Sequence, residues 1–215
     1  MKIRFKNYWR KTSLKKKEDG IFLLNHIKKI RPRNFLEIGV FHGVTSRNVC
    51  ELLHELHGNK FKFTGIDLFE NDTGKLDEEI APNIHFSNPL KNIYYRYIVR
   101  RDPYSYQSVL GLLKKFKENV NIIKGNSNDV LKEIKTEVFD YIFLDGGHKY
   151  ETVKNDLKNL MKVVNNNGTI LCDDYDLSYA PGVKKAIDEY VLLNNFNLRI
   201  LNSRFAEITK NSTQN

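Results

Sequence analysis

The stretch of sequence that decides the fold runs Phe35-Leu36-Glu37-Ile38-Gly39-Val40-Phe41-His42-Gly43-Val44-Thr45-Ser46. An apolar run that predicts a buried strand leads through two glycines into residues with a helical pattern. Gly39 permits a tight turn because it has no Cβ, and Gly43 permits a ligand to approach the backbone, where the N–H groups at the start of a helix can donate hydrogen bonds. A turn of this kind also serves simple strand-to-helix connections, so by itself it is weak evidence for a ligand.

The same alternation of apolar runs and amphipathic stretches continues along the chain and predicts an α/β fold with a doubly wound, mostly parallel sheet of seven strands. The expected strands are 34–38, 62–67, 120–124, 139–145, 169–173, 197–201 and 204–209. The expected helices are 45–57, 102–118, 129–134, 153–163 and 182–193. The last two strands flank Asn202-Ser203, so the sheet is expected to end in an antiparallel hairpin.

The connection between the second and third strands is too long for a crossover helix and its loops. We therefore predict a helical insertion at about 70–105. It contains Tyr94, Tyr95, Tyr97, Tyr104 and Tyr106 among Lys91, Arg96, Arg100 and Arg101. This mixture suits stacking and anion binding beside a cleft, but it also suits a helical cap that only packs on the domain. Both interpretations remain open.

The charge of the chain is concentrated at its beginning. Residues 1–33 hold twelve Lys or Arg against Glu18 and Asp19, a net charge of +10, whereas the other residues hold 23 basic and 24 acidic side chains, a net charge of −1. We expect one domain at 34–210, preceded by this basic segment and followed by a tail at 211–215. A basic segment can bind nucleic acid, acidic lipid or an anionic substrate, but a solvated arm is the interpretation we favour.

Composition excludes several classes of protein. No apolar stretch approaches the roughly 20 residues of a membrane-spanning helix, and residues 1–20 lack the apolar centre of a secretory signal. Cys50 and Cys172 fall in an expected buried helix and strand, and no Cys/His spacing indicates zinc. These features predict a cytoplasmic protein.

Carboxylates follow two of the expected strands, in Phe143-Leu144-Asp145-Gly146-Gly147-His148 and in Ile170-Leu171-Cys172-Asp173-Asp174-Tyr175. Because parallel strands deliver their carboxyl ends to one edge of a sheet, these three Asp residues are expected to meet. Clustered carboxylates raise one another's pKa unless a cation lies between them, and hard divalent ions accept oxygen ligands. The sequence therefore predicts a divalent metal site, with Mg²⁺ as the expected ion.

His148 lies three residues beyond Asp145, and the two intervening glycines leave the backbone free to bend. Its imidazole is therefore expected to reach a hydroxyl group bound at the metal. With an unperturbed pKa of about 6.5, a histidine can accept a proton near neutrality, so we predict a general base. A surface or helix-capping histidine is the alternative, and the neighbouring Asp residues favour the catalytic role.

Two more strand ends carry polar groups. Asp67 closes the second expected strand, where a carboxylate can accept the ribose hydroxyls of an adenosyl group, as acidic residues do in dinucleotide-binding folds. Lys124-Gly125-Asn126-Ser127-Asn128-Asp129 follows the third strand. There, Ser127 or Asn128 is either an adenine contact or the N-cap of the next helix.

This order of motifs resembles the class I S-adenosylmethionine-dependent methyltransferases over residues 34–210, and within them the metal-dependent O-methyltransferases. Bacterial O-methyltransferases of macrolide sugars and related small molecules carry a similar Asp-Gly-Gly-His followed by an Asp-Asp pair, and catechol O-methyltransferase shows the plan more distantly. Cofactor contacts are predicted on this basis at Glu37, Gly39, Val40, Gly43, Thr45, Asp67, Asn126, Ser127 and Asp145. The resemblance also implies Asp145, Asp173 and Asp174 as metal ligands and His148 as the general base.

The expected function is metal-assisted methyl transfer from S-adenosylmethionine to a hydroxyl of a sugar or other polyhydroxylated small molecule. The basic insertion could bind a phosphate or carboxylate of an anionic acceptor, such as an anionic sugar. A nucleic-acid methyltransferase is the second candidate, since the basic segment and the Tyr/Arg insertion suit phosphate and base contacts. The sequence lacks an Asn/Asp-Pro-Pro-aromatic motif, because Asn88-Pro89 continues into Leu90. The third candidate is a non-catalytic protein that uses the fold for partner binding. The O-methyltransferases that the chain resembles often form homo-oligomers, so a homo-oligomer is a further expectation.

Overall fold

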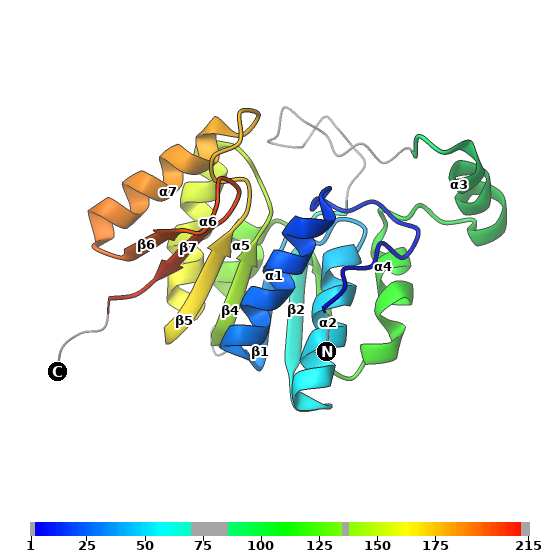
Figure 1. Ribbon diagram of the computed structural model, residues 1–215, viewed down its shortest axis with the longest axis horizontal. Coiled ribbons are helices and arrows are strands. Elements are labelled where there is room, and N and C mark those ends of the chain that lie inside the picture. Colours follow the sequence, from blue (N-terminus) through cyan, green and yellow to red (C-terminus); the bar gives the residue numbers. More distant parts are fainter. Residues whose placement is uncertain (1–2, 70–85, 135–137, 212–215) are drawn as a thin grey trace.

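The structure is a computed structural model that describes residues 3–69, 86–134 and 138–211. Its centre is a seven-stranded sheet in the order β3-β2-β1-β4-β5-β7-β6 (Figure 1). The strands are β1 Asn34–Ile38, β2 Lys62–Asp67, β3 Val120–Lys124, β4 Phe139–Leu144, β5 Val164–Cys172, β6 Asn197–Ile200 and β7 Ala206–Thr209. Strands β1 to β5 pair in parallel, and β7 is antiparallel to both β5 and β6. The predicted doubly wound sheet with a C-terminal hairpin is confirmed.

Helices cover both faces of the sheet. Their bounds are α1 Lys17–Ile30, α2 Val44–His57, α3 Pro89–Ile93, η1 Tyr94–Val99, α4 Tyr106–Leu113, η2 Lys114–Phe116, α5 Ser127–Glu133, α6 Tyr150–Val163 and α7 Pro181–Asn194. Side chains of α1, α2 and α4 pack with one face of the sheet, and those of α5, α6 and α7 pack with the other. Along β1, Phe35 faces the first layer, whereas Leu36 and Ile38 face the second. The alternation of side chains along a strand therefore builds a separate apolar core on each face.

The turn after β1 depends on its two glycines. Gly39 has a φ of 89°, and a Cβ at this position would lie only 1.9 Å from the backbone oxygen of Asp145. Gly43 has a φ of 74° and is the N-cap residue of α2. A side chain at Gly39 would force the ends of β1 and β4 apart, so this glycine is required for the two strand ends to meet.

The N-terminal segment corrects the prediction of a solvated arm. Residues 17–30 form α1, a helix that we did not predict, and its Leu23 and Ile27 are fully buried. Phe5 and Leu14 join the same core, while Lys15, Lys16 and Lys17 stay exposed. The many lysines obscured a helical spacing of apolar residues that buries one side of the segment and leaves its charges outside.

The insertion is described only from residue 86 onward, so its part at 70–85 lies outside the described residues. Its described part forms α3 and η1, which project from the body of the domain (Figure 1). The helix expected at 102–118 begins later, at Tyr106, because Ser105 caps it by accepting a hydrogen bond from the backbone N–H of Ser108. Among the described residues, no helix is long and apolar enough to cross a membrane.

Candidate active site at the carboxyl edge of the sheet

Three carboxylates meet where β4 and β5 end. Leu144 and Cys172 pair at the ends of these strands, so the residues that follow them, Asp145 and Asp173, emerge side by side. One carboxylate oxygen from each of these residues and one from Asp174 lie within 4.8 Å of one another. The geometry therefore brings together the three side chains that the sequence predicts as metal ligands.

Arg204 compensates part of this negative charge. It lies just before β7, and its Nε and Nη2 atoms are each 2.6 Å from an oxygen of Asp173, while Nη2 is also 3.1 Å from Oδ1 of Asp174. Its side chain is only 12% exposed. One guanidinium thus faces three carboxylates, and when all three are ionised the cluster keeps a negative charge that suits a further cation.

His148 and Tyr179 both form hydrogen bonds with the carboxylate of Asp174. His148 Nε2 is 2.9 Å from Oδ2 of Asp174, and the hydroxyl of Tyr179 donates to Oδ1 at 2.7 Å. The backbone N–H of Asp174 donates to Asp173 Oδ1 at 2.8 Å. These contacts fix the orientation of the His148 ring beside the acidic cluster. Asp145, His148, Asp173 and Asp174 all line one small recess there.

The three carboxylates differ in their proton affinity. Burial, reinforced by the charge of Asp174, raises the pKa of Asp173 to about 7, although Arg204 opposes this rise. Burial and the charge of Asp173 raise the pKa of Asp145 well above its usual range. Burial also acts to raise the pKa of Asp174, but the hydrogen bond from His148 and the charge of Arg204 outweigh it and lower the pKa. Asp174 is therefore the member of the cluster that ionises most readily.

The N-terminal segment reaches this cluster. Ser13 Oγ donates a hydrogen bond of 2.5 Å to Oδ2 of Asp145. The backbone oxygen of Ser13 also accepts a bond of 3.4 Å from Arg204 Nη2. A segment predicted as a separate arm thus contributes contacts to the site.

Glu37 lies under the glycine-rich turn with its side chain fully buried. Ser46 donates to Oε2 at 2.5 Å, whereas Oε1 is buried without a hydrogen-bond partner. Burial raises the pKa of Glu37 to about 8, against the effect of the Ser46 hydrogen bond. A buried polar atom without a partner is costly, and a polar group of a bound ligand would satisfy it.

Asp67 closes β2 beside the same turn. Its Oδ2 accepts from the backbone N–H of Phe41 at 2.7 Å, and its Oδ1 accepts from the N–H of Phe69 at 2.9 Å and from the Tyr104 hydroxyl at 3.0 Å. Burial raises its pKa despite these bonds. Tyr104 thus lies where a ligand hydroxyl that binds Asp67 would compete with it.

The loop after β3 differs in detail from the prediction. The N-cap of α5 is Asn126, whose Oδ1 accepts from the backbone N–H of Asn128 at 2.9 Å, and neither Ser127 nor Asn128 takes this role. Ser127 is the first residue of α5 and donates to Oδ1 of the buried Asp156 at 2.6 Å. Val40 and Thr45 are buried in the turn and in the first turn of α2. The predicted residues therefore all lie at one edge of the sheet, but they form two groups, one around Gly39 and Asp67 and one around Asp173.

Sequence reasoning missed Arg204, Tyr179 and Ser13, and it named Tyr104 in the insertion without its contact to Asp67. None of them belongs to a local motif, because each contacts a partner that is distant in sequence or lies in an irregular loop. The one available signal was the position of Arg204 in the expected hairpin, next to the strand that carries Asp173.

Comparison with known proteins gives three kinds of result. Residues 36–175 match a protein family described as a methyltransferase domain, and this range includes every predicted site residue. An uncharacterized protein, R132, of Acanthamoeba polyphaga mimivirus is 42% identical over 53 residues, which is 24% of this chain and 24% of that protein. The match to R132 spans about a quarter of either chain, so it carries no statement about the whole of either.

Solved structures with the same fold include several methyltransferases. The O-methyltransferase NovP has a TM-score of 0.66 and 19% identity, covering 89% of this chain and 81% of its own. The methyltransferase PaMTH1 of Podospora anserina, solved with S-adenosylhomocysteine, has a TM-score of 0.61 and 16% identity, covering 92% and 80%. CalS11, a TDP-rhamnose 3'-O-methyltransferase, has a TM-score of 0.60 and 15% identity, covering 91% and 80%. At these identities the likeness shows the shared fold.

Proposed function

The chain belongs to the methyltransferase domain family, and from that premise we propose its reaction. The protein transfers a methyl group from S-adenosylmethionine to a hydroxyl of a sugar or other polyhydroxylated small molecule. A divalent metal ion assists this transfer, and His148 is the general base. The observation that carries the proposal is the cluster of Asp145, Asp173 and Asp174 with His148 held against it. A methyltransferase that needed only to bind its cofactor would not require three converging carboxylates.

The residues around the glycine-rich turn fit S-adenosylmethionine. Oε1 of Glu37 is a buried polar atom without a hydrogen-bond partner, and Asp67 presents a carboxylate at the end of β2. Gly39 and Gly43 have no Cβ at the two ends of this turn. We assign the cofactor to these residues together with Val40, Thr45, Asn126, Ser127 and Asp145.

The acidic cluster fits a divalent ion by the chemistry of its donors. Carboxylate oxygens are hard ligands, and three of them within 4.8 Å can surround one ion. Arg204 already lies against both oxygens of Asp173, so an ion at this position would compete with the guanidinium. We assign Asp145, Asp173 and Asp174 as the ligands and Mg²⁺ as the expected ion.

The residues of the chain have separate tasks in the proposed reaction. When bound, S-adenosylmethionine supplies an electrophilic methyl group, and a divalent ion lowers the pKa of a hydroxyl that it binds. Asp174 orients His148 through Nε2, so Nδ1 is the ring atom that we assign to accept the proton of the acceptor hydroxyl. The carboxylates hold the acceptor in place, which lowers the barrier by positioning.

A polyhydroxylated acceptor is favoured because neighbouring hydroxyls can chelate a metal ion that the cluster holds. Several solved structures with this fold are named as O-methyltransferases, and CalS11 is described as acting on TDP-rhamnose. These names agree with the proposed class of acceptor, and the assignment to this chain rests on its own acidic cluster.

Calorimetry with S-adenosylhomocysteine tests the cofactor assignment. We expect the wild type to bind it and Asp67→Ala to bind it at least tenfold more weakly. Absence of binding by folded wild-type protein would overturn the proposal and favour a protein that uses the fold only for partner binding.

Titration with Mg²⁺ and an acceptor screen test the chemistry. We expect Asp173→Ala to lose metal binding, and chelator to abolish methylation of a hydroxylated acceptor identified by mass spectrometry. His148→Gln should then lower kcat about 100-fold or more while the affinity for S-adenosylhomocysteine stays unchanged. Methylation that persists in full with chelator would remove the metal from the mechanism, and an unchanged kcat would remove His148.

A further inference from the structure

The described part of the insertion presents an exposed apolar face. Residues 89–99 form the continuous helical segment α3 and η1. Its exposed apolar side chains, with their exposed fractions, are Leu90 69%, Ile93 52%, Tyr94 37%, Tyr97 61% and Ile98 70%. The spacing of three, one, three and one residues places them on the same side of the segment.

The exposure is concentrated at this place. Trp9, which is 61% exposed, lies beside Tyr94 with the ring centroids 5.9 Å apart. Eleven large apolar side chains are exposed in the described part of the chain, and six of them are Trp9 and the five on this segment. A contiguous exposed apolar patch often marks an interaction site, whereas apolar side chains scattered singly over a surface do not.

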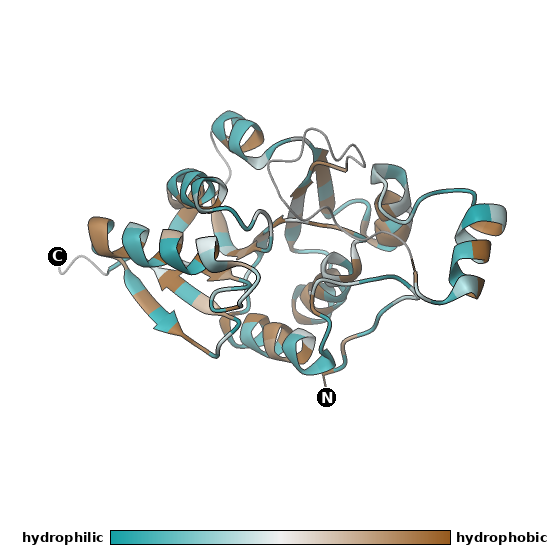
Figure 2. Ribbon diagram, turned by 90° about the horizontal axis from the view of Figure 1, so that it is seen from above, coloured by the Kyte–Doolittle hydropathy of each residue, from teal (hydrophilic) through white to brown (hydrophobic). Residues whose placement is uncertain are grey.

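The segment is anchored by its opposite side, so the exposed face is not displaced core. Tyr95 is 8% exposed and stacks on Phe86 with ring centroids 5.2 Å apart. Phe86 in turn contacts the ring of His42, in the glycine-rich turn, at 6.0 Å. Figure 2 shows the segment at the edge of the molecule with apolar bands among polar ones.

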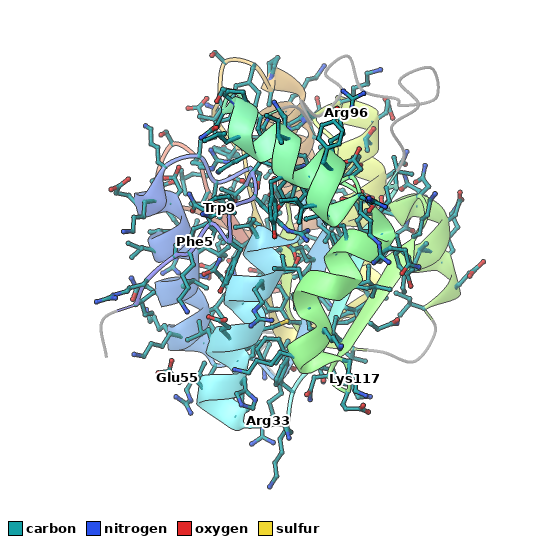
Figure 3. All side chains as sticks on the ribbon, turned by 90° about the vertical axis from the view of Figure 1, so that its right-hand side faces the viewer. Phe5, Trp9, Arg33, Glu55, Arg96 and Lys117 are labelled. Carbon is teal, nitrogen blue, oxygen red and sulfur yellow. The ribbon has the colours of Figure 1, made fainter. Side chains whose placement is uncertain are left out.

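The charge around this face has one sign. Residues 86–101 contain Lys91, Arg96, Arg100 and Arg101 and no Asp or Glu. The three arginines are exposed, and the Nζ atom of Lys91 lies 5.9 Å from the ring centroid of Trp9. Figure 3 views this side of the molecule, with Arg96 on the outer helical segment and Trp9 labelled. Apolar, aromatic and basic side chains together are the combination that binds at the surface of an anionic bilayer.

We propose that residues 86–101, together with Trp9, form a docking surface for an anionic lipid membrane, which the protein binds at its surface without spanning it. Leu90, Ile93 and Ile98 favour lipid over nucleic acid, because aliphatic side chains enter hydrocarbon but do not stack on bases. A second copy of the chain is disfavoured, because it would bring two groups of four basic residues together.

Vesicles of stated composition provide the test, and Trp9 is the one tryptophan of the chain. We expect vesicles of phosphatidylglycerol mixed with phosphatidylcholine to sediment the full-length protein and to shift the Trp9 fluorescence to shorter wavelength. Vesicles of phosphatidylcholine alone should bind at least tenfold more weakly, and added salt should weaken binding to the anionic vesicles.

Matched variants locate the surface. The pair Tyr97→Ser with Ile98→Ser should weaken binding at least tenfold, whereas Leu192→Ser with Leu193→Ser, which alters side chains of α7 that are 82% and 76% exposed, should leave it unchanged. The pair Arg96→Gln with Arg101→Gln should also weaken it about tenfold, and Lys114→Gln with Lys117→Gln should not. All altered side chains are exposed, so the variants are expected to fold as the wild type does.

Three results would overturn the proposal. The first is equal sedimentation with anionic and neutral vesicles, and the second is equal binding by the apolar variant pairs on η1 and on α7. The third is that vesicles leave the Trp9 fluorescence unchanged and another partner shifts it, with the shift lost in the same variants. A shift with a single-stranded RNA oligonucleotide would assign the face to nucleic acid, and a shift with rising protein concentration would assign it to a second copy.

Discussion

Arg204 Nε lies 2.6 Å from Oδ1 of Asp173, and Arg204 Nη2 lies 2.6 Å from Oδ2 of the same residue. The Nη2 contact is a hydrogen bond between two charged groups, which is stronger than one between neutral groups, whereas the Nε contact is an ion pair without hydrogen-bond geometry. The pair joins the loop between β6 and β7 to the residue that follows β5, so the C-terminal hairpin supplies a cation to the acidic cluster. Arg204 therefore reduces the net negative charge of the acidic cluster to which a metal ion would bind.

Replacement of Arg204 by methionine should increase the affinity for a divalent ion. The ion would no longer displace a guanidinium from Asp173, and we expect Mn²⁺, as a probe for the site, to bind about tenfold or more tightly in Arg204→Met. Without metal, the variant should be less stable by about 3 kcal/mol, because a buried carboxylate loses its partner. Mn²⁺ should restore part of that loss. Calorimetry and thermal unfolding with and without Mn²⁺ measure both effects.

The control is Arg199→Met on β6, because Arg199 pairs with Glu207 at 2.6 Å and does not touch the acidic cluster. It should leave the affinity for Mn²⁺ unchanged. Equal Mn²⁺ affinity in Arg204→Met and the wild type would show that Arg204 and the ion do not compete.

Asp67 and Tyr104 give opposite predictions for cofactor affinity. Asp67→Ala removes the proposed acceptor of the ribose hydroxyls and should weaken S-adenosylhomocysteine binding at least tenfold. Tyr104→Phe removes only the hydroxyl that donates to Asp67 Oδ1 and should leave binding unchanged or up to about threefold tighter. Calorimetric titration of both variants checks the pair. A loss in Tyr104→Phe as large as in Asp67→Ala would mean that Tyr104 itself contacts the cofactor.

Glu37 makes the stability of the protein depend on pH. Burial raises its pKa from 4.5 to about 8, so the folded state holds this proton more tightly than the unfolded chain does. The resulting stabilisation is complete below pH 4.5 and is lost as the pH rises through 8. Glu37→Gln removes this titration. Between pH 5 and pH 8.5 the free energy of unfolding of the wild type should therefore fall by on the order of 3 kcal/mol relative to that of Glu37→Gln.

Urea unfolding at the two pH values measures this difference. Glu55→Gln, which alters an exposed glutamate on α2, is the control and should follow the wild type at both pH values. Parallel pH dependence of the wild type and Glu37→Gln would show that Glu37 does not retain its proton in the folded state.

The strand ends explain why much of the fold and the acidic cluster could be predicted. Asp145 and Asp173 follow apolar runs of a length and composition typical of buried parallel strands, and such strands bring their carboxyl ends to one edge. The chain between them is one strand-helix-strand unit, so their proximity follows from local pattern and one topological rule.

Other contacts depend on tertiary packing that no local pattern encodes. Arg204 is 31 positions from Asp173 and lies in a loop before a short strand. The N-cap of α5 is displaced by one residue from the prediction, because Asn126, Ser127 and Asn128 all have side chains suited to capping. Helix α1 was missed for a different reason, since Leu23 and Ile27 do have helical spacing but lie among lysines that suggested a solvated segment.

Two glycine-to-alanine substitutions, Gly20→Ala in α1 and Gly111→Ala in α4 as its reference, test the packing of the N-terminal segment. Gly20 lies in α1 against Phe5, and a Cβ there would approach the Phe5 ring to 2.3 Å. Gly20→Ala should therefore displace Phe5 from the core and lower the free energy of unfolding by about 1–3 kcal/mol. Gly111 lies in α4 with no atom within 4 Å of the added Cβ, so Gly111→Ala should raise the free energy of unfolding by about 0.5–1 kcal/mol through helix propensity. Urea unfolding of both variants compares them directly. A gain in Gly20→Ala equal to that in Gly111→Ala would mean that Phe5 does not pack on α1, because propensity alone favours alanine at both positions.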